Sequence, residues 1–294
     1  MALRYDAGEV ITAMVTPFKE DLTIDFEGVE KLVNHLINNG SDAVLIAATT
    51  GESPTLTHEE EIELLKVTRS AAGNKAKVII SAGSNCTQTA VEQSQKIQKT
   101  GLADAILQVV PYYNKPSQAG LISHFTQIAK SVDLPVLLYN IPGRTGINML
   151  PETIAEIAQK NQNVFGVKQS NGDLDQVSEI ILNCPHDFTV LSGDDSLTLP
   201  MLSLGARGVV SVASHIIGKE IKQMIRVFKL GKVNEATAIH SKFYPIFKKI
   251  FMTSNPCPIK AALDKLNIIS DRVRSPLVTL TNEQKAELFT TLQI

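Results

Sequence analysis

Eight short apolar runs recur along the chain, and the segments between them have helical patterns. The runs are Val10–Val15, Ala43–Ala48, Val78–Ile80, Ala105–Val110, Pro135–Leu138, Val164–Val167, Phe188–Leu191 and Gly208–Val212. Most of them start roughly 26 to 35 residues apart, which is the length of one strand with its following helix. A regular series of such βα units predicts a parallel sheet.

The segments between the runs carry helix signals. Apolar residues within 26–37 follow a helical period, and Asn39-Gly40 marks the expected C-terminal end. Thr57 is followed three residues later by Glu60, the pattern of a capping box. Pro151 stands where the first residue of a helix is expected. These signals support helices between the strands.

Eight βα units can close into a barrel or form an open, doubly wound sheet. The open sheet that binds dinucleotides needs a G-x-G-x-x-G loop after its first strand, whereas Thr16-Pro17-Phe18 follows the first run here. A chain of 294 residues fits one barrel of about 250 residues with an extension, or two smaller domains. Eight strands match the closure of a barrel. We therefore expect an α/β fold, a (β/α)8 TIM barrel over residues 1–218.

Further helical patterns follow the eighth run. They cover Ile221–Leu230, Glu235–Phe251, Ile259–Leu266 and Thr281–Leu292. We assign residues 219–294 to a C-terminal helical extension packed on the barrel.

Charge and composition give no support for nucleic-acid or membrane partners. The net charge is −2, which does not favour nucleic acid. Cys86, Cys184 and Cys257 are an odd number without C-x-x-C spacing, which favours reduced thiols in the cytoplasm. Residues 1–10 lack the apolar stretch of a signal peptide, and no apolar run approaches the roughly 18 residues of a membrane span. We expect a cytoplasmic protein with no nucleic-acid or membrane partner.

Lys168 is the residue with the strongest chemical implication. It stands at the end of the apolar run Val164–Val167, where a charged ammonium is costly unless it is paired. Burial favours the neutral form of an amine, and a neutral amine can attack a carbonyl carbon to form a Schiff base. The alternative is a lysine at a strand end whose head reaches water or a carboxylate.

Other polar residues follow the remaining runs, at the strand ends that form the functional face of a βα barrel. Thr49-Thr50-Gly51 could bind a carboxylate through hydroxyl and backbone N–H groups, or be an ordinary turn. Tyr139 could pass protons near Lys168, or be a half-buried aromatic residue. Arg144 could bind a carboxylate with both arms of its guanidinium, or be a solvated loop residue.

No metal or cofactor motif is present in the sequence. The six histidines are scattered and form no H-E-x-x-H pattern. The phosphate-binding pattern G-x-x-x-x-G-K-[ST] is also missing. We expect neither a metal nor a cofactor.

Several longer stretches carry a family resemblance. They are Thr49–Ser53, Val110–Pro116, Tyr139–Gly146, Gly166–Lys168, Ser192–Asp195 and Asn255–Lys260. With these the chain resembles the pyruvate-dependent class I aldolases, and within them the dihydrodipicolinate synthase family. The resemblance extends from Gly8 to the C-terminal helices. The Gly143–Gly146 loop and Tyr112–Asn114 are the features that separate this family from the N-acetylneuraminate lyases.

The resemblance implies a reaction and its substrates. Pyruvate would form an imine with Lys168, and the derived enamine would attack the aldehyde of L-aspartate 4-semialdehyde. Thr50 and Val210 would hold the pyruvate, and Arg144 would bind the carboxylate of the aldehyde substrate. The product, 4-hydroxy-tetrahydrodipicolinate, is a precursor of diaminopimelate and lysine.

The resemblance also implies a proton relay and an assembly. Tyr139 would pass protons and would be linked through Thr49 to Tyr113. In this family the second tyrosine comes from the neighbouring subunit, so a dimer is the minimal active unit that the resemblance implies. Two such dimers usually form a tetramer, so the implied assembly is a homotetramer, a dimer of dimers.

Two other functions stay open at this point. One is a different pyruvate-dependent aldolase that acts on a keto-sugar acid, although Arg144 argues against it. The other is a non-catalytic barrel that binds small acids. Borohydride trapping with pyruvate separates an enzyme from a binding module.

Overall fold

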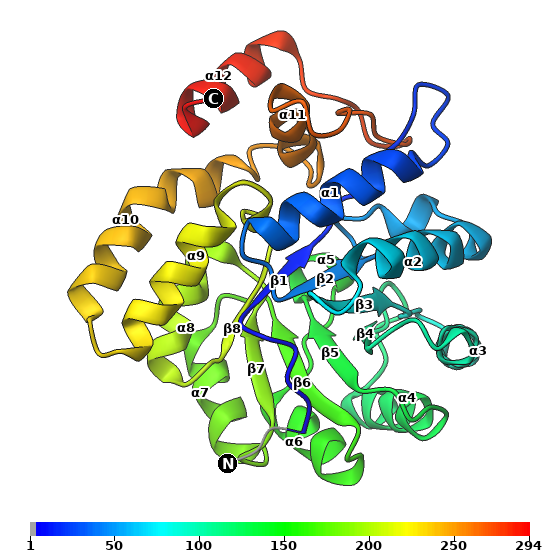
Figure 1. The fold of residues 1–294 in the computed structure, drawn as a ribbon. Coiled ribbons are helices and arrows are strands. Elements are labelled where there is room, and N and C mark those ends of the chain that lie inside the picture. Colours follow the sequence, from blue (N-terminus) through cyan, green and yellow to red (C-terminus); the bar gives the residue numbers. More distant parts are fainter. Residues whose placement is uncertain (1–3) are drawn as a thin grey trace. The chain divides into compact units, whose positions relative to one another are not determined.

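The computed structural model describes residues 4–294, and its strands and helices alternate along the chain (Figure 1). The strands form a closed barrel of parallel strands in the order β1 to β8. Their bounds are β1 Val10–Ala13, β2 Ala43–Ile46, β3 Lys77–Ser81, β4 Ala105–Val109, β5 Val136–Asn140, β6 Val164–Gln169, β7 Thr189–Ser192 and β8 Gly208–Ser211. Each lies on one of the eight apolar runs, so the predicted TIM barrel is confirmed.

The helices between and after the strands include the four expected at the C-terminal end. Their bounds are α1 Phe26–Asn38, α2 His58–Ala72, α3 Thr87–Thr100, α4 Gln118–Lys130, α5 Pro142–Thr145, α6 Pro151–Lys160, α7 Leu174–Asn183, α8 Thr198–Leu204, α9 Ser214–Lys229, α10 Val233–Lys249, α11 Cys257–Lys265 and α12 Asn282–Leu292, with 3-10 turns at Ser53–Thr55 and Asp195–Leu197. No helix within residues 4–294 is long and apolar enough to cross a membrane.

The expected helix signals act as predicted. Thr57 and Glu60 form a complete capping box at the start of α2, each side chain bonded to the backbone N–H of the other. Pro151 is the first residue of α6. Asn39 is the C-cap of α1, and Gly40 after it has a φ of +98°, a conformation that glycine adopts readily.

The chain packs into two compact units. One contains residues 79–210 together with the segment before residue 10, and the other contains residues 10–78 and 211–294. The boundary between barrel and extension at residue 218 stays a prediction.

In the unit that contains residues 79–210, parallel strands pair in chain order. The register joins Ile106 to Val136 between β4 and β5, and Tyr139 to Lys168 between β5 and β6. The residues of β5 and β6 are buried along their whole length, because strands of a parallel sheet are covered on both faces. The pairing places Tyr139 and Lys168 side by side.

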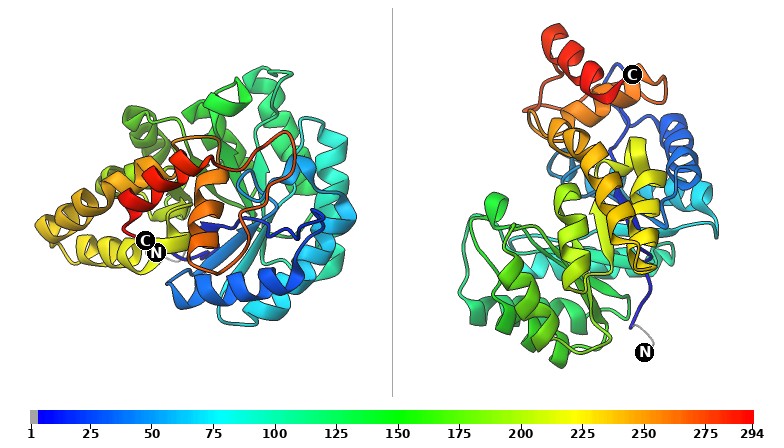
Figure 2. Two further views of the ribbon diagram at one scale, coloured as in Figure 1. Left: turned by 90° about the horizontal axis from the view of Figure 1, so that it is seen from above. Right: turned by 90° about the vertical axis from the view of Figure 1, so that its left-hand side faces the viewer.

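The unit that contains residues 10–78 and 211–294 combines two strands with the C-terminal helices. β1 pairs with β2, with Thr12 opposite Val44. Helix α9 packs against α10, and α12 packs against both α10 and α11 (Figure 2). Nearly all of α11 is buried, so this helix lies inside its unit.

The end of β5 differs from the prediction, whereas the end of β6 agrees with it. Strand β5 continues to Asn140, beyond the end of its apolar run, and β6 ends at Gln169. Tyr139 therefore lies within β5 and not after it, because backbone pairing with β6 extends through this residue. Lys168 is the last residue but one of β6, at the end of the strand, where the sequence placed it.

Candidate active site

Lys168 is buried in β6 and lies against the ring of Tyr139 on β5. Lys168 is only 6% exposed, and its Nζ lies 4.0 Å from the centre of the Tyr139 ring. Tyr139 is 5% exposed. The amine thus has an aromatic neighbour whose hydroxyl can take part in proton transfer.

A second buried lysine, Lys260, has a structural role, because it forms an ion pair with a carboxylate. Lys260 is fully buried, and its Nζ lies 2.6 Å from a carboxylate oxygen of Glu52. Burial lowers the pKa of Lys260, and Glu52 opposes that effect. Within residues 4–294, Lys168 forms no such ion pair. The alternative in which the head of Lys168 reaches a carboxylate is therefore wrong for the described residues.

Arg144 lies in α5, on the loop that joins β5 to α6. Asn140 closes this loop, because its side chain accepts from the Met149 N–H at 3.0 Å and donates to the Met149 carbonyl. Thr145 donates to the Ile141 carbonyl at 3.0 Å, and Gly146 takes a φ of +76°. Arg144 itself is exposed, and its guanidinium has no hydrogen-bond partner among residues 4–294, so it is available for a ligand.

The segment after β4 presents Tyr113 to solvent. Tyr113 is 89% exposed and has a φ of +74°, a left-handed conformation that is unusual for a tyrosine. Asn114 and Asn85 hold the segment: Asn114 donates to the Asn85 carbonyl, and Asn85 donates to the Tyr112 carbonyl. The Tyr113 N–H reaches the Thr145 carbonyl at 3.3 Å. The segments that carry Tyr113 and Arg144 are thus bonded to each other.

Val210 lies in β8, which pairs with β7, and is 1% exposed. The unit that contains residues 79–210 therefore holds five of the predicted site residues. They are Tyr113, Tyr139, Arg144, Lys168 and Val210. Lys168 and Tyr139 are in direct contact.

Thr49 and Thr50 follow β2 in the other unit. Thr50 is buried, and Thr49 is partly exposed. The Glu52 N–H donates to the Thr49 carbonyl at 3.1 Å, so the segment forms a tight turn. Gly51 fits this turn because a Cβ there would meet the Ala47 N and the Met14 O, both at 3.1 Å.

Two polar residues of the C-terminal segment contact this turn, and sequence reasoning assigned no role to either. Asn255 donates from Nδ2 to the Thr50 Oγ1 at 2.9 Å, and Lys260 pairs with Glu52. One signal was available: Lys260 stands among Ile259, Ala261, Ala262 and Leu263, and a lysine in such an apolar stretch needs a buried partner.

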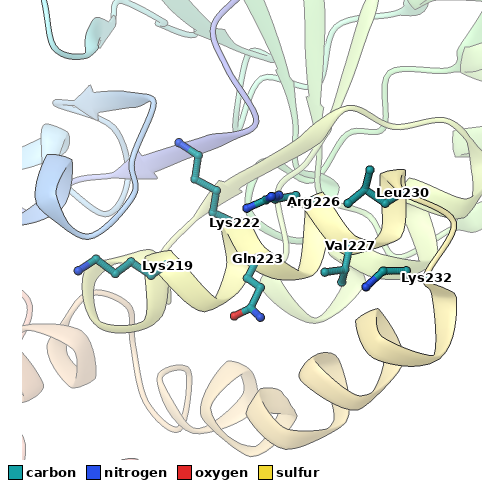
Figure 3. A pocket seen from close by; sticks show the side chains of 7 residues that line it. All are labelled: Lys219, Lys222, Gln223, Arg226, Val227, Leu230 and Lys232. Carbon is teal, nitrogen blue, oxygen red and sulfur yellow. The ribbon is translucent and has the colours of Figure 1, made fainter.

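A basic hollow lies elsewhere, on α9 and the turn after it (Figure 3). It is lined by Lys219, Lys222, Gln223, Arg226, Val227, Leu230 and Lys232. Lys222 pairs with Asp42, and Lys232 pairs with Glu235. None of the predicted site residues lines it. Residues 4–294 also contain no group of three His, Cys, Asp or Glu side chains placed to hold a metal.

Comparison with known proteins shows to which family the chain belongs. The Dihydrodipicolinate synthetase family matches residues 6–294. The 4-hydroxy-tetrahydrodipicolinate synthase 1 of Halalkalibacterium halodurans is 50% identical over 281 residues, which cover 96% of this chain and 95% of that protein.

Solved structures are similar over the same length. The dihydrodipicolinate synthase of Cyanidioschyzon merolae, solved with lysine bound, has a TM-score of 0.95 and 48% identity, covering 98% of this chain and 97% of that one. The chloride-inhibited enzyme of Acinetobacter baumannii, in complex with pyruvate, has a TM-score of 0.94 and 34% identity, covering 98% of both chains.

Proposed function

We propose that this chain, which belongs to the Dihydrodipicolinate synthetase family, condenses pyruvate with L-aspartate 4-semialdehyde to give 4-hydroxy-tetrahydrodipicolinate. This reaction supplies the biosynthesis of diaminopimelate and lysine. The observation that carries the proposal is Lys168, a buried amine with no carboxylate partner among residues 4–294, in contact with Tyr139.

The Nζ of Lys168 attacks the carbonyl carbon of pyruvate, and loss of water leaves an imine. Removal of a proton from the methyl group converts the imine into an enamine. The enamine carbon then forms a bond to the aldehyde carbon of L-aspartate 4-semialdehyde, and the aldehyde oxygen takes up a proton. The product amine closes the ring when it attacks the imine carbon and releases Lys168.

Two sets of residues bind the substrates in this proposal. Thr50 donates a hydrogen bond to the pyruvate carboxylate, and Val210 lines the pyruvate-binding site. Arg144 binds the carboxylate of the second substrate, and its exposed guanidinium, which has no partner among residues 4–294, supports that role.

Tyr139 moves protons during imine formation and hydrolysis, in a relay with Thr49 and Tyr113. The great exposure of Tyr113, 89% in a left-handed backbone conformation, supports a role outside its own subunit. We propose that Tyr113 completes the relay of a neighbouring subunit and that the protein is a homotetramer, a dimer of dimers. The three cysteines are unpaired, which suits the reducing cytoplasm as the site of action.

Borohydride trapping tests the proposal directly. The protein is incubated with pyruvate and sodium borohydride, digested and mapped by mass spectrometry. We expect one reduced pyruvate adduct, on the peptide that contains Lys168, and no adduct in Lys168→Ala. An adduct on Lys260 or any other lysine instead would overturn the assignment.

Substrate use separates the proposal from the aldolase of keto-sugar acids. A coupled assay with pyruvate and L-aspartate 4-semialdehyde should show turnover, whereas cleavage of a keto-sugar acid should not. Trapping without turnover of either substrate would instead point to a pyruvate-binding protein.

A further inference from the structure

Thr50 is held by a side chain that is distant in sequence. The Asn255 Nδ2 donates to the Thr50 Oγ1 at 2.9 Å, and the two residues are 9% and 4% exposed. They are 205 positions apart in the chain. Because both side chains are buried, water does not compete effectively for this hydrogen bond.

This bond determines which way the Thr50 hydroxyl can act. A threonine hydroxyl has one proton to donate and two lone pairs to accept with. The Asn255 amide occupies a lone pair, so the Thr50 proton remains available for an acceptor. Within residues 4–294 no protein acceptor takes that proton. A carboxylate is the acceptor that gains most from such a donor.

The rest of the C-terminal segment fixes the same turn at a second point. Both carboxylate oxygens of Glu52 are used: one pairs with Lys260 at 2.6 Å, and the other accepts from the Arg274 N–H at 2.9 Å. The ammonium of Lys260 also lies 4.3 Å from the centre of the Phe18 ring. Glu52 itself has a φ of +59°, so this clamp holds a backbone conformation that a glutamate rarely adopts.

We propose that Asn255 is a positioning residue for substrate binding, which orients the Thr50 hydroxyl so that its proton is donated to the pyruvate carboxylate. The inference rests on the proposed function for the identity of that carboxylate. Asn255 touches Thr50 and acts through it, while the Lys260–Glu52 pair keeps the turn in register.

The first test compares substitutions at Asn255. In Asn255→Ala the KM for pyruvate should rise about threefold to tenfold, the effect of one lost hydrogen bond. Asn255→Asp has the same shape, but its carboxylate accepts the Thr50 proton and repels the substrate anion, so the rise should exceed tenfold. The KM for L-aspartate 4-semialdehyde should change less than twofold in both variants.

The second test is a double-mutant cycle with Thr50→Val, which removes the hydroxyl and keeps the shape. If Asn255 acts through Thr50, Asn255→Ala should have no further effect on the KM for pyruvate in the Thr50→Val protein. An additive effect would show that Asn255 acts elsewhere. Arg272→Ala is the control for a weakened C-terminal segment, because its exposed guanidinium pairs with Glu20; it should leave the KM for pyruvate unchanged.

Thermal unfolding of each variant separates positioning from a structural role. If Asn255→Ala and Asn255→Asp lower the melting temperature but change both KM values equally, the inference is wrong. Should Asn255→Ala fail to fold, the isosteric Asn255→Asp still carries the test. The unmodified protein is assayed first: without a pyruvate adduct on Lys168 the proposed function fails, whatever Asn255 does.

Discussion

Arg144 presents its guanidinium to solvent from a loop that hydrogen bonds hold at both ends. These hydrogen bonds position Arg144 but do not involve its guanidinium. Since the guanidinium has no partner in the described part of the chain, Arg144 is the residue to replace in order to separate the binding of the two substrates.

We predict that Arg144→Ala damages use of L-aspartate 4-semialdehyde and spares pyruvate. Loss of one charge-assisted contact should cost about 1.5–3 kcal/mol in kcat/KM for the aldehyde. Borohydride trapping with pyruvate should proceed as before. Arg144→Lys keeps the charge but loses the two-armed geometry. Its kcat/KM for the aldehyde should therefore lie between that of the unmodified protein and that of Arg144→Ala. Equal loss of trapping and condensation would contradict the division of roles.

The buried pair of Glu52 and Lys260 joins the turn after β2 to helix α11. The attraction between two buried charges is offset by the loss of their hydration. Removing one partner is different, because the other charge is left buried without a counterion.

We predict that Lys260→Met lowers the free energy of unfolding by about 3–5 kcal/mol. Adding Glu52→Gln should restore part of the loss, since no buried charge then remains. Urea unfolding at neutral pH measures both effects. Lys66→Met is the matched control: its pair with Glu63 is half exposed and should contribute less than about 1 kcal/mol. A loss in Lys260→Met no greater than in this control would show that the pair is not a stabilising link.

His215, the second residue of helix α9, has no access to water. His215 is fully buried; its Nδ1 donates to the Val212 carbonyl at 2.8 Å, and its Nε2 accepts from the Val15 N–H at 3.2 Å. Burial lowers the pKa of His215 to about 4. A proton on Nε2 would also face the Val15 N–H, so the neutral ring is the form that fits.

This arrangement predicts a loss of stability in mild acid. The pKa of His215 is lower in the folded chain than in the unfolded one, about 4 against a reference of 6.5. Its contribution is therefore fully present above about pH 6.5 and is lost as the pH falls towards 4. Between pH 7.5 and 4.5 the loss should be roughly 2–3 kcal/mol.

Urea unfolding at the two pH values checks this expectation. His215→Gln, which carries no titrating ring, should show a smaller pH dependence by that amount, even though its stability at pH 7.5 is reduced. His186→Gln is the control, since His186 is exposed. If His215→Gln keeps the full pH dependence, other groups cause the acid sensitivity.

At the scale of the whole molecule, the position of Tyr113 bears on how many chains make one active unit. A tyrosine that is 89% exposed contributes little to the stability of its own chain. Its hydroxyl has no hydrogen-bond partner among residues 4–294, in keeping with the role in a neighbouring subunit that we propose.

We predict that two inactive variants rescue each other. Tyr113→Phe and Lys168→Ala should each be nearly inactive alone. After subunit exchange, a site with Lys168 from one variant and Tyr113 from the other is complete, and about one quarter of the sites in an equal mixture should be of this kind. Activity after exchange, with hybrids verified by native mass spectrometry, measures the rescue. The control is the double variant Tyr113→Phe/Lys168→Ala, mixed with protein that has not undergone subunit exchange. Hybrids that are verified but inactive would place the role of Tyr113 within its own subunit.

Much of the barrel could be predicted because its signals are local. Every strand lies on an apolar run. Helix α1 ends just before Gly40, α2 begins directly after Thr57, and α6 begins at Pro151. Apolar periodicity and capping depend on residues a few positions apart, so they can be read along the chain. The end of β5 was placed too early, because pairing with β6 extends β5 through the polar residues Tyr139 and Asn140.

The sequence by itself determined the order of the strands and helices, and it pointed to Lys168 as a lysine in an apolar strand. Only the tertiary structure separated the two buried lysines, since the partner of Lys260 is 208 positions away and Lys168 contacts Tyr139 instead. The tertiary structure also brought Asn255 to Thr50. Such contacts depend on how whole elements pack, because a buried polar group takes the partner that folding places beside it, however far apart the two lie in the chain.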